Sequence, residues 1–102
     1  MSEKLSPEQL TQALDEAARR VVVGARYRHY KGSQYTVTGL ALAEATQTVM
    51  VVYRAEYADR WTFVRPLDNW LETVAVDGRS VKRFARVDPD GEGVFGSDTP
   101  GK

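Results

Sequence analysis

The stretch ARYRHYKGSQYTVTG, residues 25–39, is the most informative part of this chain. Its aromatic and β-branched residues on both sides of a Gly-Ser turn predict a strand, a tight turn and a second strand. Side chains alternate between the faces of a strand, so Tyr27 and His29 share one face while Arg28 and Tyr30 share the other. One face is therefore expected to enter a core, and the other to expose arginine and tyrosine.

The sequence after residue 39 continues with the same pattern of short predicted strands separated by turns. Asp77-Gly78 is a strong signal for a two-residue hairpin, and residues 66–70 indicate a turn or a single helical turn. We predict a mainly β fold, a small SH3-like barrel of five or six short strands with an N-terminal amphipathic helix. The expected strands are residues 25–30, 35–43, 48–55, 62–65, 73–76 and 79–81.

Residues 5–22 carry the pattern of an amphipathic helix. Ser6 stands at the N-cap position, Pro7 at the first helical position, and Gln9 completes a capping box. An apolar stripe follows at helical spacing through Leu10, Ala13, Leu14, Ala17, Ala18 and Val21. The stripe is expected to pack on the β-domain, and a helix-mediated dimer is the alternative.

The net charge of zero conceals an uneven distribution of charge along the chain. Both ends are acidic, whereas residues 19–87 hold twelve Lys or Arg against six Asp or Glu. The Gly- and Pro-rich residues 88–102 have few apolar side chains and are predicted to be a disordered acidic tail. The expected organisation is a helix over residues 1–23, a β-barrel domain over 24–87, and this tail.

Several kinds of site are excluded by the residues present. The chain has no cysteine, and His29 is its only histidine, so a typical zinc or iron site is not expected. No phosphate-binding glycine loop is found, and His29 is interpreted as a structural residue of the sheet. With a polar N-terminus and no long apolar run, we expect a cytoplasmic protein that makes no membrane contact and uses no cofactor or metal.

Ordered short motifs resemble one known family. The motifs are Tyr27-Arg-His-Tyr-Lys-Gly32, Val51-Val-Tyr-Arg54, Val64-Arg-Pro-Leu67 and Val76-Asp-Gly78. They are similar to those of a group of small bacterial domains, the domain-of-unknown-function family 1653. The family pattern usually has His-Ser-Glu-Thr where this chain has Ala43-Glu-Ala-Thr46, so chemistry that depends on that histidine and glutamate is not expected here. The resemblance implies no particular activity.

Aromatic and cationic side chains alternate through the middle of the chain, as in small barrels that bind single-stranded nucleic acid. Tyr35, Tyr53, Phe63 and Trp70 are expected to fill the core. We predict a binding module for nucleic acid, a nucleotide or another phosphate-bearing ligand. The alternatives are a protein-interaction adaptor and, least favoured, an enzyme that uses Glu44 or Glu56. The candidate ligand-binding residues are Arg28, Tyr30, Lys31, Arg54, Trp61 and Arg65.

Overall fold

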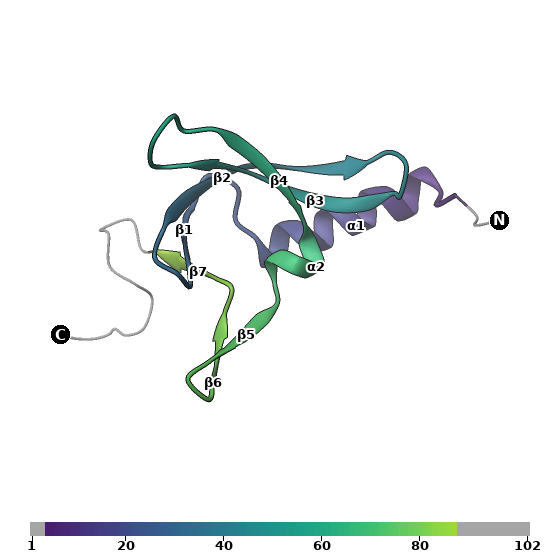
Figure 1. Ribbon diagram of the computed structural model, residues 1–102. Coiled ribbons are helices and arrows are strands. Elements are labelled where there is room, and N and C mark those ends of the chain that lie inside the picture. Colours follow the sequence, from purple (N-terminus) through teal and green to yellow (C-terminus); the bar gives the residue numbers. More distant parts are fainter. Residues whose placement is uncertain (1–3, 88–102) are drawn as a thin grey trace.

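The computed structural model describes residues 4–87, which form seven strands and two helices (Figure 1). Five strands make one antiparallel sheet in the order β4-β3-β2-β1-β7, and the other two form a separate hairpin. The bounds are α1 Pro7–Arg20, β1 Arg26–His29, β2 Gln34–Ala43, β3 Thr48–Ala55, β4 Thr62–Pro66, α2 Leu67–Trp70, β5 Thr73–Val76, β6 Arg79–Lys82 and β7 Phe84–Val87.

The mainly β fold with an N-terminal helix is confirmed. The long strands β2 and β3 pair along nearly their whole length, with an irregularity between Val37 and Gly39 that breaks the register. Such a bulge bends a strand and increases its twist. Within residues 4–87 the edge strands β4 and β7 do not pair with each other, so the curved sheet stays open between them.

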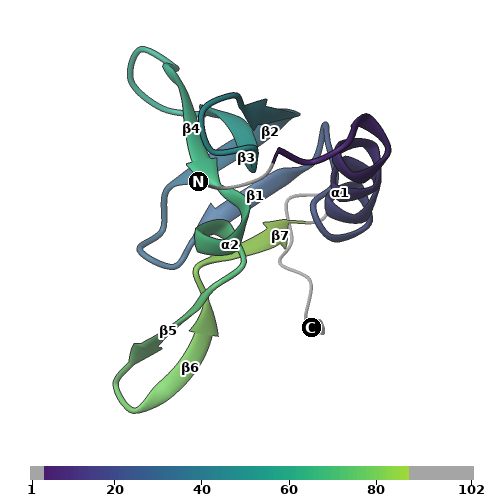
Figure 2. The same cartoon turned by 90° about the vertical axis from the view of Figure 1, so that its right-hand side faces the viewer.

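Helix α1 begins where its capping residues predict. The Ser6 hydroxyl accepts from the backbone N–H of Gln9, and the Gln9 side chain accepts from the backbone N–H of Ser6. The helix lies beside β2 and β3 (Figure 2). Its buried contact is concentrated at the C-terminal end, where Ala17 and the C-cap residue Val21 are inaccessible to solvent while Leu14 is only half-buried. Packing on the β-strands, the first of the two alternatives for the helix, is what the structure contains.

The hairpin of β5 and β6 projects away from the five-stranded sheet (Figure 2). Its turn residues Asp77 and Gly78 both have positive φ, of 51° and 79°, as a hairpin turn of this length prefers. After β6 the backbone of Arg83 bonds both to Glu72 and to Tyr30, which ties the hairpin to the end of β1. Strand β7, which follows at once, was not among the expected strands.

Aromatic rings build the core on one face of the sheet. Trp70 from α2 stacks on Phe84 with ring centroids 3.7 Å apart, and the edges of Tyr27 and Tyr53 pack against Trp70. Val21, Val37 and Val51 complete the cluster. Two expected core residues are more accessible: Tyr35 is half-buried, and the expectation for Phe63 is wrong, because this residue lies on the edge strand β4 and is 38% exposed.

Candidate ligand-binding site

The strand register assigns the predicted cations to two different faces of the sheet. Directly paired residues share a face. Arg54 pairs with Thr36 and Arg28 with Gln34, on the face that points away from the core, here called the outer face. Arg65 instead pairs with the fully buried Val51, on the interior face.

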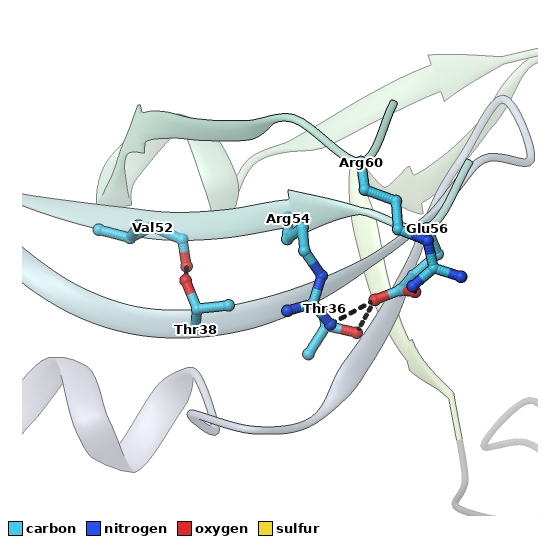
Figure 3. Close-up of polar contacts among 6 residues, drawn as sticks. All are labelled: Thr36, Thr38, Val52, Arg54, Glu56 and Arg60. Carbon is cyan, nitrogen blue, oxygen red and sulfur yellow. Dashed lines mark hydrogen bonds and ion pairs between the residues drawn. The ribbon is translucent and has the colours of Figure 1, made fainter. Parts of the chain in front are cut away.

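Arg54 on the outer face belongs to a small polar network around Glu56 (Figure 3). The carboxylate accepts a hydrogen bond from the Thr36 hydroxyl and forms ion pairs with Arg54 (3.0 Å) and Arg60 (3.2 Å). The Thr36 hydrogen bond, followed by the two arginines, lowers the pKa of Glu56. A carboxylate that is ionised and already bonded on both oxygens is a poor general acid or base, so the network is structural.

Three cationic side chains and one histidine lie near the end of β1. His29, Lys31, Arg65 and Arg83, here called the cationic cluster, come from β1, the following turn, β4 and the segment between β6 and β7. The Tyr30 ring lies 4.5 Å from the His29 ring, and the Lys31 ammonium lies 5.8 Å from the Tyr30 centroid. Three separate segments of the chain therefore contribute charge to one location.

His29 has a defined tautomer and a lowered pKa within this cluster. Its Nδ1 accepts a hydrogen bond from the backbone N–H of Lys31 (3.1 Å), so the ring proton of the neutral form is on Nε2. Burial, and after it the charges of Arg65, Arg83 and Lys31, lowers the pKa of His29. The ring is therefore a neutral donor at pH 7 and is surrounded by positive charge.

Both arginines of the cluster are fixed by other side chains. Arg65 donates from Nε to the Tyr53 hydroxyl and from Nη1 to Asn69, and its guanidinium lies 5.1 Å from the Phe84 ring centroid. Arg83 is paired with Glu72 at 2.7 Å. Their planar donor groups are therefore oriented before any ligand arrives, which lowers the entropic cost of binding.

An apolar depression, here called the aromatic hollow, lies around the connection between β3 and β4. It has a volume of about 220 Å³ and is lined by Ala55, Tyr57, Ala58, Asp59, Arg60, Trp61 and Phe63. Trp61 is 65% exposed and Tyr57 45%. Large rings this exposed on a small domain are typical of a contact surface.

Tyrosines connect the hollow to the cationic cluster. The Tyr57 hydroxyl is 2.9 Å from that of Tyr35, and the Tyr35 ring packs edge-on against Phe84. Burial and the hydrogen bond to Tyr57 raise the pKa of Tyr35 to about 12, so this hydroxyl stays protonated. Phe63 and Arg65 stand two residues apart on the same face of β4, about 6.6 Å along the strand.

The structure thus divides the six predicted ligand residues. Tyr30, Lys31 and Arg65 come together in or beside the cationic cluster, and Trp61 lines the neighbouring hollow. Arg28 and Arg54 lie on the outer face. Sequence reasoning missed Arg83, whose place beside His29 depends on the pairing of β7 with β1.

Within residues 4–87 no three His, Cys, Asp or Glu side chains are placed to hold a metal ion, and no helix there is long and apolar enough to span a membrane.

Comparison with known proteins gives a family and no activity. A family model described as "Protein of unknown function (DUF1653)" matches residues 25–86. A crystal structure of a DUF1653 protein from Bordetella bronchiseptica is similar, with 42% sequence identity, a TM-score of 0.58, and coverage of 63% of this chain and 85% of that chain. No curated protein matches the chain. The motifs, the family model and this solved structure agree, and the chain belongs to the DUF1653 family.

Proposed function

We propose that this protein is a binding module for single-stranded nucleic acid, which lies across the cationic cluster and the aromatic hollow. The observation that carries the proposal is the sequence of Trp61, directly before β4, and Phe63 and Arg65 on one face of β4, in which two accessible rings precede a fixed cation. Proteins that bind single strands combine stacking rings with a positively charged groove that follows the backbone.

The same surface has the charge that a phosphate backbone requires. Lys31, Arg65 and Arg83 all lower the pKa of His29, and Arg83 is paired with the carboxylate of Glu72. Arginine in a fixed orientation binds phosphate oxygens through two donors, and Tyr30 adds a third accessible ring next to the cations. We therefore assign phosphate contacts to the cluster and base contacts to Trp61, Phe63 and Tyr30.

The proposal is tested by fluorescence anisotropy with a labelled single-stranded oligonucleotide over a series of salt concentrations. Three phosphate contacts predict a slope of about 2 in log affinity against log salt, from about 0.7 for each contact. Lys31→Ala should lower the slope by about 0.7, whereas Arg28→Ala on the outer face should leave it unchanged. No binding at low salt, or equal effects of the two substitutions, would refute the assignment.

Trp61 supplies an independent readout of the ring contacts. Trp61→Ala should weaken binding by about 1 to 3 kcal/mol if a base stacks on the indole. The two tryptophans differ sharply in accessibility, since Trp70 is 2% exposed and Trp61 is 65% exposed. Ligand-dependent quenching of tryptophan fluorescence should therefore disappear in Trp61→Phe.

The apolar lining of the hollow also favours a second candidate, a protein-interaction adaptor. An extended peptide could place an apolar side chain between Trp61 and Phe63. That binding would depend weakly on salt and would not change in Lys31→Ala, so the salt titration separates the two functions.

The curvature of the sheet leads us to propose further that the fold is an SH3-like barrel. Five antiparallel strands bend around Trp70, and the short helix α2 that carries this residue directly follows the edge strand β4. A superposition of this sheet on SH3 domains of known structure tests the assignment, and a different strand order would contradict it.

A further inference from the structure

The cationic cluster gathers basic side chains around His29 from three parts of the chain. His29 offers its Nε2–H because Nδ1 is occupied by the Lys31 backbone. Lys31 is exposed and extends from the turn that follows β1. Arg65 and Arg83 are each anchored by part of the guanidinium, to Tyr53 and to Glu72 respectively. Arg65 also donates from Nη1 to Asn69, and the Arg83 Nε is buried without a partner, so within residues 4–87 the donors that make no hydrogen bond at the protein surface are Nη2 of Arg65 and Nη1 of Arg83.

The charge of the cluster is larger than one internal phosphate of a nucleic acid would need. Lys31, Arg65 and Arg83 carry three positive charges, and Glu72, which is paired with Arg83, offsets one of them. The balance is two positive charges next to a neutral histidine. An internal phosphodiester carries a single negative charge, whereas a phosphomonoester carries about −1.5 to −2 at pH 7 and has three acceptor oxygens.

We propose that the cationic cluster binds a terminal phosphate monoester, at the end of a nucleic acid strand or on a nucleotide. The inference rests on the proposed function and specifies the ligand group at one part of its surface. The three free oxygens accept from the His29 Nε2–H, from Lys31 and from Arg83, while the Tyr30 ring beside His29 stacks on the adjoining base. An internal phosphodiester has two free oxygens and satisfies fewer of these donors.

The aromatic hollow gives the bound strand a direction. Arg65 and Phe63 lie on one face of β4, and Trp61 lies directly before the start of this strand, so the two rings follow Arg65 away from the cluster. A strand with its terminal phosphate at the cluster can therefore place its following bases on Phe63 and Trp61. Removal of Trp61 should weaken strands with and without the terminal phosphate by the same factor.

The experiment compares three labelled oligonucleotides of one sequence, carrying a 5′-phosphate, a 3′-phosphate or hydroxyls at both ends. Anisotropy at pH 7.5 and fixed salt should show that one phosphorylated form binds about tenfold more tightly than the hydroxyl form. The form that binds more tightly identifies which end is recognised. A nucleoside monophosphate should compete with it, and the corresponding nucleoside should not.

Two single substitutions test whether the preference for a terminal phosphate depends on the cationic cluster. Lys31→Ala should reduce the preference for the terminal phosphate to about threefold or less, while Arg28→Ala, the exposed cation on the outer face, should retain it. Circular dichroism melts of both variants check that they are folded. Equal affinity for all three oligonucleotides would overturn the terminal-phosphate inference and leave the proposed function intact. If none of the three binds, both fail.

Discussion

The substitution Val21→Ala tests how the helix is attached to the sheet. Val21 caps the C-terminal end of α1, is fully buried, and lies in the core cluster with Val37 and Trp70. The change removes two buried carbon groups, and the lost free energy of burial is about 1.6 kcal/mol, at about 0.8 kcal/mol for each group. The cavity left in a closed site raises the expected loss of unfolding free energy to about 2 to 3 kcal/mol. For a domain of this size the melting temperature should fall by about 10 to 20 °C.

Leu14→Ala is the matched comparison, because it tests whether a substitution in the middle of α1 costs less stability than one at its C-terminal end. Leu14 is in the middle of the apolar stripe but is only half-buried, so we expect its loss to cost about 1 to 2 kcal/mol. Urea unfolding followed by circular dichroism measures both variants, and the dependence on urea should stay the same. A larger loss for Leu14→Ala, or an unchanged midpoint for Val21→Ala, would show that α1 is not anchored through its C-terminal end.

Three further predictions concern pH, the helix cap and the C-terminal segment. The pKa of His29 is lower in the folded state, so the unfolded chain binds more protons as pH falls below about 6.5, and the free energy of unfolding decreases there. Urea midpoints measured from pH 7.5 to pH 5 should decrease accordingly, and His29→Gln should reduce this dependence on pH. Ser6→Ala removes the capping hydrogen bond to Gln9 and should cost about 1 kcal/mol in the same urea assay, whereas an unchanged midpoint would contradict the role of the cap. Removal of residues 88–102, which lie outside the described residues, should leave the melting temperature unchanged, because the core is built from Val21 to Phe84; a large decrease would mean that the segment packs on the body.

Local chemistry was enough to predict most of the elements. The capping residues Ser6 and Gln9 identify the start of α1, and Asp77-Gly78 identifies the hairpin of β5 and β6. Strand β7 escaped prediction because it is four residues long and is separated from β6 by Arg83 alone, without a turn signal. It is a strand because it pairs with β1, more than fifty residues earlier, and such a pairing leaves no local pattern.

The candidate site was predictable only in part for the same reason. Lys31 and Tyr30 lie in a recognisable turn, but the contribution of Arg83 depends on the distant pairing of β7 with β1. Arg28 looks equivalent to Lys31 in the sequence, yet its direct pairing with Gln34 puts it on the outer face. Phe63 was expected in the core because aromatic residues usually lie there, and its place on an edge strand left it accessible.

The core and the candidate site share some side chains. Substitution of a shared residue changes stability and binding together, whereas substitution of an exposed site residue changes binding alone. Phe84 stacks on Trp70 in the core and at the same time lies under the Arg65 guanidinium and against the His29 ring. A substitution of Phe84 therefore lowers stability and displaces the cations together. Lys31 is exposed, so its removal changes the charge of the cluster without opening the core. For this reason the decisive experiments on function are substitutions of exposed cations and of Trp61, whose effects on affinity can be measured in a protein of unchanged stability.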